Sequence, residues 1–324
     1  MRLYPVTLLL LALLFFVSCS SEEPEFSFED QDREVPEFSS ERAYQYIEEQ
    51  VAFGPRVPNM EGHVETINYL REHFEENAGS GNVFVQEFEQ EVYGETLTMF
   101  NLLASFGTQH SDRIMLAAHW DTRPRGEEDP TNPDDPILGA DDGGSGVGVL
   151  MEIARVFAEN DVPIGVDIVL FDGEDYGEEG DLDNYFLGAR HWSNNPPVPG
   201  YSPRYGILLD MVGGEDAIFA KERYSLRYAS SLVDEVWNIA ADKGYGDLFV
   251  DEQGGFVSDD HVVVNQEAGI PMINIIHHSV NEDGSVNFPP YWHTQNDNMD
   301  IIDTNTLQAV GDVVLELIYN RIPR

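Results

Sequence analysis

The spacing of apolar and polar residues predicts alternating helices and strands from residue 39 onward. Behind Ser39, which favours a helix start, Ala43, Ile47 and Val51 recur at helical intervals. Further helices are predicted over residues 61–77, 145–159, 229–243, 260–268 and 305–320. Short apolar or alternating runs predict strands over residues 83–92, 99–106, 113–119, 166–171, 205–212 and 271–276.

Strands that alternate with helices favour an α/β fold. The expected architecture is a three-layer sandwich with a central mixed, mostly parallel sheet flanked by helices, in which the early strands form an antiparallel portion. The chain has 324 residues, enough for one large domain with a sizeable core. No internal repeat and no second domain is evident, so residues 39–324 are expected to form a single catalytic domain.

The N-terminal segment has the pattern of an export signal. An unbroken apolar run over residues 6–17 is too short to span a bilayer and predicts a signal peptide over residues 1–18. Cys19, the only cysteine, sits where a bacterial lipoprotein signal carries its lipidated cysteine, and an ordinary cleaved signal is the alternative. Residues 19–38 are acidic and punctuated by proline, so we expect a tether there and a protein lipid-anchored to the cell envelope, periplasmic or cell-surface.

The charge of the chain excludes some classes of partner. Acidic residues number 60 against 17 basic ones, which gives a formal net charge of −43 at pH 7. Such a surface repels nucleic acid and anionic membranes, so neither is expected as a partner. Self-repulsion on this scale destabilises a compact state unless salt screens it, and we therefore expect a halophilic, salt-dependent fold. An acidic secreted protein is the alternative.

Five polar clusters carry candidate chemistry, and most of them follow predicted strands. They lie at residues 116–121 (LAAHWD), 139–146 (GADDGGSG), 171–175 (FDGED), 208–213 (LLDMVG) and 290–294 (PYWHT). The adjacent carboxylates of Glu174 and Asp175 repel each other unless a cation or a shared proton offsets them. A divalent metal would let one carboxylate ligate while its neighbour acts as a general acid/base. A solvated acidic loop is the alternative.

The position of these clusters predicts one site. In open α/β sheets, ligands bind outside the carboxyl ends of the parallel strands. No single cluster is specific, because a lone His-x-Asp is weak and Asp-Asp-Gly is common in turns. The ordered set of five in one α/β domain is the strong signal.

This ordered set resembles the zinc aminopeptidase superfamily of co-catalytic metallopeptidases, whose fold also houses animal-type glutaminyl-peptide cyclotransferases. Over residues 40–322 the chain is more similar to the glutaminyl cyclases, especially their bacterial lipoprotein relatives. The discriminating segments are residues 208–213 (LLDMVG), 258–261 (SDDH) and 292–294 (WHT). In the aminopeptidases the late histidine is typically not preceded by tryptophan.

The resemblance implies one zinc ion per chain, bound by Asp142, Asp175 and His293. It makes Glu174 the general acid/base. Animal enzymes have glutamate at the position of Asp175, and the shorter arm can ligate if its loop sits closer.

The resemblance also implies roles for residues near Glu174. Asp210 and Asp259 match carboxylates that share a short hydrogen-bond network with it, and Trp292 matches an aromatic wall of the substrate pocket. Tyr185 is expected to take the place of a second pocket tryptophan. Asn274 stands where animal cyclases have a histidine near the metal.

The expected reaction is cyclisation of an N-terminal glutamine of peptides or proteins to pyroglutamate, with release of ammonia. The main alternative is a dinuclear zinc aminopeptidase, in which His119 and Asp210 add a second metal site and Asp142 bridges both ions. A catalytically inactive binding module is a third class, against which the intact Glu174 and His293 count. The basic pair Arg123 and Arg125 beside the site is expected to stabilise its loop.

Overall fold

The computed structural model describes residues 24–323. The predicted signal peptide, Cys19 and the first residues of the predicted tether lie outside this range. Within it, no helix is both long enough and apolar enough to cross a membrane.

A six-stranded mixed sheet forms the centre of the molecule. Its strands lie in the order β2 (Val83–Val92), β3 (Glu95–Phe106), β5 (Gly165–Phe171), β4 (Arg113–His119), β6 (Gly206–Asp210) and β9 (Met272–Ile276). The pairs β2–β3 and β3–β5 are antiparallel, and the run from β5 through β4 and β6 to β9 is parallel. The predicted mixed, mostly parallel sheet with an early antiparallel portion is confirmed.

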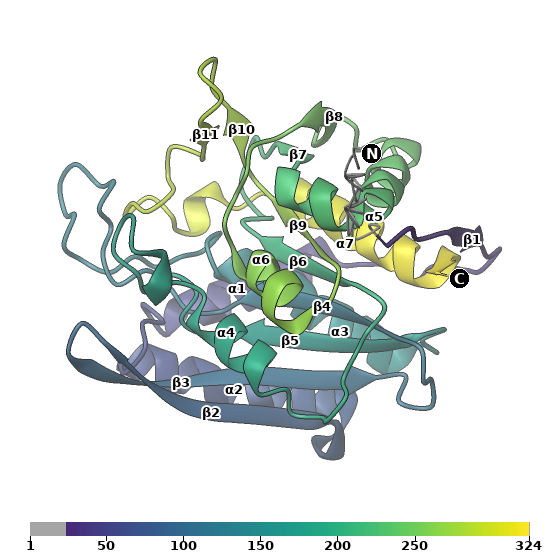
Figure 1. Cartoon of the computed structure of the whole chain (residues 1–324), viewed down its shortest axis with the longest axis horizontal. Helices are drawn as coiled ribbons and strands as arrows, with labels where there is room; N and C mark the ends of the chain where they lie inside the picture. Colours follow the sequence, from purple (N-terminus) through teal and green to yellow (C-terminus); the bar gives the residue numbers. More distant parts are fainter. Residues whose placement is uncertain (1–23, 324) are drawn as a thin grey trace, which may run out of the picture.

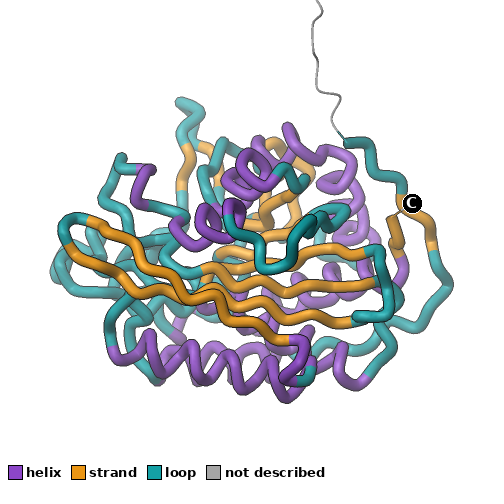
Figure 2. Tube along the Cα trace, turned by 60° about the horizontal axis from the view of Figure 1, so that its bottom comes forward, coloured by secondary structure: helices purple, strands orange, loops and turns teal. Residues whose placement is uncertain are grey.

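Helices cover both faces of this sheet. One face packs against α1 (Ser40–Ala52), α2 (Glu61–Ala78), α3 (Gly144–Glu159), α5 (Arg223–Asp242) and α7 (Thr304–Asn320), and the other against α4 (Leu187–Asn194) and α6 (Asp260–Val263). Figure 1 shows α4 and α6 in front of the strands and α1 to α3 behind them, and Figure 2 shows the sheet edge-on between the helical layers.

Side-chain alternation along the strands builds both cores. In β4, Leu116 packs into the large core beneath α3 and α7, whereas its neighbour Met115 packs into the smaller core beneath α4. Successive side chains of a strand point to opposite faces, so a strand covered on both sides is apolar throughout. That continuous apolar run is why the sequence marks β4 at its observed ends, residues 113–119.

The helix predicted over residues 229–243 begins earlier than expected. Helix α5 starts at Arg223 behind the cap Glu222, and its backbone is non-helical at Ala229, with φ −155° and ψ 55°. The kink interrupts the helical spacing of the apolar residues, so the sequence did not predict the turns before Ala229. The segment predicted as one helix over residues 260–268 is α6 followed by a π-helical turn, Val264–Ala268.

Several short elements were not predicted. They are the strand pairs β7 (Phe219–Lys221) with β8 (Phe249–Gln253) and β10 (Ser279–Val280) with β11 (Val286–Asn287), together with the single-turn helices Ser80–Asn82, Leu182–Asn184 and Met299–Ile301. Strands of two to five residues give little or no periodic signal.

Part of the predicted tether lies against the domain. Strand β1 (Phe28–Asp30) pairs with β12 (Arg321–Pro323), which follows α7. The rings of Phe26 and Phe28 lie 5.4 and 6.2 Å from the ring of Tyr205. The chain is therefore attached to the domain from about Phe26 onward, beside its C-terminal strand.

Candidate active site and metal centre

The strand order places the site at a topological switch point. β4 lies between β5 and β6 in the parallel run, and the chain continues from it to β5 on one side and later to β6 on the other. His119 is the last residue of β4 and Asp210 the last of β6. Glu174 follows β5 through Gly173, whose φ of 66° is a conformation that glycine adopts without strain. These carboxyl ends meet at one edge of the sheet.

A cavity of about 240 Å³ opens at this edge. All the residues that the sequence assigned to the site line it: Asp142, Glu174, Asp175, Tyr185, Asp210, Asp259, Trp292 and His293. The rest of the lining is partly acidic and partly apolar, and includes Glu127, Met211 and Phe288. The structure therefore brings together residues that are up to 151 positions apart in the chain (142 to 293).

Asp142, Asp175 and His293 form a group that fits a metal ion. Their ligand atoms all lie within 4.8 Å of one another, and all three side chains are buried. Nε2 of His293 lies 3.7 Å from Oδ2 of Asp142 and 3.5 Å from Oδ2 of Asp175. Oδ2 of Asp175 is buried without a hydrogen-bond partner. Two carboxylate oxygens and an imidazole nitrogen are a donor set typical of catalytic zinc.

A second group shares Asp142. Nε2 of His119 lies 3.1 Å from Oδ1 of Asp142 and 3.2 Å from Oδ1 of Asp210, and these three residues also present ligand atoms within 4.8 Å of one another. The residues of the dinuclear alternative are thus also close together. The arrangement of carboxylates and histidines permits one metal or two.

Glu174 is a buried carboxyl beside these groups. Burial raises its pKa well above the ordinary value, and the negative charges of Asp175, Asp259 and Asp260 raise it further, against the opposing effect of His119. A carboxyl of this kind can accept and return a proton near neutral pH. Its position next to the candidate metal ligand Asp175 suits it to the role of general acid/base.

The two carboxyls expected to share hydrogen bonds with Glu174 have other partners. Asp259 accepts from Nδ2 of Asn274 at 2.5 Å, and Asp210 lies against His119. Burial, together with the charge of Asp210, raises the pKa of Asp259 to about 7. Asp259 therefore acts on Glu174 through its charge.

Two buried aspartates hold the loops that carry the candidate metal-ligating carboxylates. Oδ1 of Asp121 accepts from the main-chain N–H of Glu174 at 3.0 Å and its Oδ2 from that of Asp175 at 3.2 Å. Asp297 does the same for residues 141 and 142, at 2.8 and 3.1 Å. Asp297 was not identified from the sequence, where only its position four residues after His293 points to the site.

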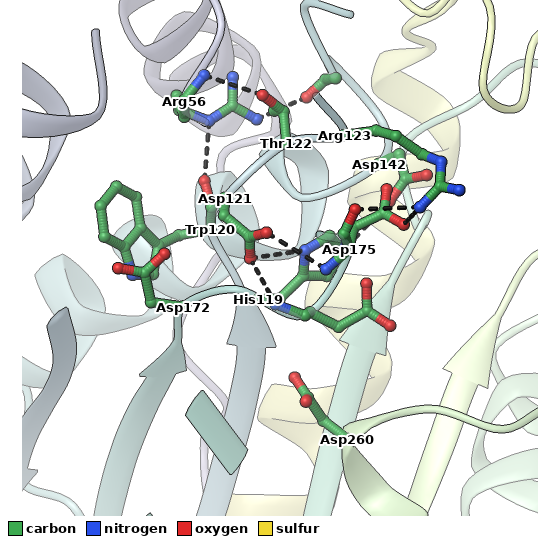
Figure 3. Close-up of polar contacts among 12 residues, drawn as sticks. Arg56, His119, Trp120, Asp121, Thr122, Arg123, Asp142, Asp172, Asp175 and Asp260 are labelled. Atoms are coloured by element: carbon green, nitrogen blue, oxygen red, sulfur yellow. Dashed lines mark hydrogen bonds and ion pairs between the residues drawn. The ribbon is translucent and has the colours of Figure 1, made fainter. Parts of the chain in front are cut away.

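The basic pair beside the site stabilises its loop, as predicted. Arg123 is buried and donates through Nη1 to Oδ1 and to the main-chain oxygen of Asp175, at 2.8 and 3.0 Å (Figure 3). Arg125 donates to the carbonyls of Tyr176 and Gly177. Burial opposes ionisation of Asp175, but His293 and Arg123 outweigh it and lower the pKa of Asp175, so this carboxylate is ionised and able to ligate.

Several residues that line the cavity have strained backbones. Phe186, Met211 and His293 have φ of 60°, 47° and 55°, in the left-handed region that non-glycine residues seldom adopt. Each such residue costs about 1 kcal/mol or more and persists only where the surroundings hold it. In this conformation the imidazole of His293 lies beside Asp142 and Asp175.

The aromatic residues expected in the pocket lie at its wall. Trp292 stacks on Phe288 with ring centroids 4.6 Å apart and on the His293 ring at 3.5 Å. Tyr185 also lines the cavity, and the guanidinium of Arg123 lies 5.3 Å from the centre of its ring. Trp292 thus both bounds the cavity and supports a metal-ligand candidate.

Comparison with solved structures gives neighbours that match along nearly their whole length. The chain is 46% identical to a Zn-dependent exopeptidase from Parabacteroides distasonis, with a TM-score of 0.84 over 89% of this chain and all of that one. It is equally identical to the glutaminyl cyclase of Bacteroides thetaiotaomicron, solved with bound N-acetylhistamine, with a TM-score of 0.83 over 88% of this chain and 99% of that one.

Curated relatives are more distant. A glutaminyl-peptide cyclotransferase of Drosophila melanogaster is 25% identical over 67% of this chain, and the aminopeptidase YwaD of Bacillus subtilis is 29% identical over 67%. The chain spans 64% and 42% of the lengths of these two relatives. The model of peptidase family M28 matches residues 101–318, which include every residue assigned to the site. The chain therefore belongs to peptidase family M28.

Proposed function

We propose that this protein is a zinc-dependent glutaminyl-peptide cyclotransferase, which converts the N-terminal glutamine of peptides or proteins to pyroglutamate and releases ammonia. The observation that carries the proposal is the buried Glu174 carboxyl beside the donor group of Asp142, Asp175 and His293, in a cavity walled by Trp292. The 46% identity to a bacterial glutaminyl cyclase over 88% of the chain supports it.

Asp142, Asp175 and His293 would hold one zinc ion, which as a Lewis acid polarises the γ-carbonyl of the substrate. Glu174 takes a proton from the α-amine as its nitrogen attacks the carboxamide carbon and a new C–N bond forms. Glu174 then gives the proton to the amide nitrogen, the old C–N bond breaks, and ammonia leaves. The carboxyl ends as it began, so no net proton is consumed by the protein.

The cavity favours attack by the amine over attack by water. The rings of Trp292, Phe288 and Tyr185 and the side chain of Met211 line it, so apolar groups form part of the wall around a bound glutamine side chain. A glutamine whose chain folds back on itself places its own amine next to the carbonyl, which gives that amine a large entropic advantage. Hydrolysis would instead yield glutamate.

The second candidate, a dinuclear aminopeptidase, draws on the group of His119, Asp142 and Asp210. It is less favoured because glutaminyl cyclases of Bacteroides thetaiotaomicron, Porphyromonas gingivalis and Tannerella forsythia match the chain at 45–46% identity over 86–88% of its length, although a Zn-dependent exopeptidase matches it equally well. In an aminopeptidase Glu174 would activate water, and no pyroglutamyl product would form.

Zinc content and product analysis on one purified sample separate the two functions. The protein is incubated in high salt with a glutaminyl dipeptide and, in parallel, with a leucyl dipeptide. One zinc per chain, ammonia and a pyroglutamyl dipeptide support the cyclotransferase. Two zinc ions per chain with free amino acid from either dipeptide would make the protein an aminopeptidase.

We also propose that the protein is exported and anchored through a lipid on Cys19. The apolar run before that cysteine and the acidic segment after it support this location. In a bacterial host, the wild-type chain should fractionate with membranes and Cys19→Ser should be released from them. Equal membrane association of the two chains would contradict the anchor.

A further inference from the structure

Arg56 lies in the turn between α1 and α2, outside the residues that the family model matches, yet its side chain reaches the loops of the site. It is fully buried, and its guanidinium donates to main-chain carbonyls. Nε donates to the oxygen of Trp120 at 2.9 Å, Nη1 to that of Leu138 at 2.8 Å and Nη2 to that of Gly139 at 2.7 Å. Figure 3 shows this guanidinium pointing at the segment that follows His119.

The carbonyls that Arg56 binds belong to two segments that carry site residues. Trp120 separates His119 from Asp121, and Gly139 lies three residues before Asp142. The main-chain N–H of Arg56 also donates to Oγ1 of Thr122, at 2.8 Å. One residue therefore ties the end of β4 to the turn that leads into α3.

That turn is tightly wound, so its hydrogen bonds decide where Asp142 lies. Gly139 and Gly143 have φ of 58° and 86°, in the left-handed region that glycine adopts without strain. A Cβ on Gly139 would collide with the main-chain oxygen of Asp142 and the side chain of Thr122. A displacement of the Gly139 carbonyl would therefore be transmitted to Asp142.

Arg56 also contributes charge. Burial lowers its pKa to about 10, against the effects of Asp297, Asp121 and Asp142, so the guanidinium is protonated at neutral pH. These three carboxyls are themselves buried. A buried cation among buried carboxylates offsets part of the cost of removing each from water.

We propose that Arg56 is a positioning residue, which fixes the turn of residues 138–142 against the end of β4 and so presents Asp142 to a metal ion held with Asp175 and His293. The inference rests on the proposed zinc site but not on the reaction. It assigns a role in metal binding to a residue that lies 86 positions before Asp142 in the chain (142 − 56).

The test compares two arginine-to-lysine variants. Lysine keeps the charge, but its single nitrogen replaces donors that are spread across a planar fork. Arg113→Lys is the matched control, because Arg113 also donates to carbonyls, those of Phe106 and Val166, and to Asp167, at the far end of β4 from the site. Zinc affinity is measured by competition with a chelator in high salt, and folding by circular dichroism and thermal unfolding.

Arg56→Lys is expected to remain folded and to bind zinc at least tenfold more weakly than wild type, while Arg113→Lys loses stability and keeps its zinc affinity. Wild-type affinity in folded Arg56→Lys would overturn the proposal, and so would equal loss in both variants. If neither Arg56→Lys nor Arg56→Gln folds with zinc present, Arg56 is a general stability residue and the proposal fails. Loss of zinc affinity without any cyclisation by wild type would refute the proposed reaction alone.

Discussion

Nε2 of His119 lies 3.2 Å from Oδ1 of Asp210, across the ends of the neighbouring strands β4 and β6. Burial would lower the pKa of His119, but hydrogen bonds with Asp121, Asp142 and Asp210 raise it well above the ordinary value. A protonated imidazole has no lone pair for a metal. The carboxylates around His119 can therefore hold a protonated imidazole in place of a second zinc ion, and the zinc content of the protein distinguishes the two.

The first prediction tests this alternative through zinc content, and the single zinc ion of the proposed function is the expected result. Wild type and His119→Ala should each hold one zinc per chain, whereas His293→Ala should hold much less than one, because it removes the nitrogen donor of the Asp142–Asp175 group. Metal analysis after gel filtration measures this. Two zinc ions in wild type, falling to one in His119→Ala, would contradict the single-metal site.

The second prediction concerns Glu174. Glu174→Gln keeps the shape of the side chain but cannot take a proton, so kcat should fall by about 10²- to 10⁴-fold. KM and zinc content should change little, because Glu174 is not one of the donors in the Asp142–Asp175–His293 group. Ammonia release from a glutaminyl dipeptide measures kcat, and a fall of less than threefold would remove Glu174 from the reaction.

The third prediction concerns the pH dependence of the reaction. A general base must be ionised, so kcat/KM should fall as the pH drops through the raised pKa of Glu174. The charge of Asp259 contributes to raising that pKa. Asp259→Asn removes the charge, lowers the pKa of Glu174 and should move the acidic limb to lower pH, whereas Asp259→Glu should leave it in place. If the acidic limb of the kcat/KM profile stays at the same pH in Asp259→Asn, Asp259 does not act on Glu174.

Much of the site was predictable from the sequence because its residues lie where apolar runs end. The run before His119 and the run before Asp172 mark β4 and β5 within one residue, and the parallel arrangement then brings their ends together. The cluster that contains His293 was a candidate from the sequence, but the role of His293 as a metal ligand came only from the resemblance, since it follows no strand of the central sheet.

The residues that hold the loops could not be predicted in the same way. Asp297 bonds to main-chain N–H groups 156 and 155 positions away, and Arg56 bonds to carbonyls 64 to 83 positions away. Main-chain groups are present at every residue, so a sequence carries no pattern for such pairs. The kink at Ala229 was missed for a related reason, because no proline or glycine marks it in the sequence.

The fourth prediction concerns stability near α5. Burial would raise the pKa of Glu222, but His261 and the N–H groups of Tyr224 and Ser225 outweigh it and lower the pKa to about 2. A carboxyl whose folded-state pKa is lowered stabilises the fold at pH values above its unfolded pKa, and this contribution is lost as the pH falls from about 5 to 2.

Glu222→Gln should therefore lower the free energy of unfolding by roughly 2 to 3 kcal/mol at pH 7, and the difference from wild type should shrink toward zero near pH 2. Urea unfolding at several pH values measures it. Glu72→Gln, on the exposed side of α2, is the control and should change stability by less than about 0.5 kcal/mol. A difference between Glu222→Gln and wild type that does not depend on pH would contradict the ionic origin of the stabilisation.

The last prediction concerns salt. The net charge of −43 imposes self-repulsion that ions screen, since the Debye length falls from about 30 Å at 0.01 M to about 3 Å at 1 M salt. The midpoint of thermal unfolding should therefore rise steeply between these two concentrations of KCl. Sucrose at matched osmolality should raise it less, because it stabilises by exclusion from the surface and leaves the charges unscreened. Equal midpoints at low and molar KCl would show that short-range ion pairs such as Arg113 with Asp167 already compensate the acidic surface.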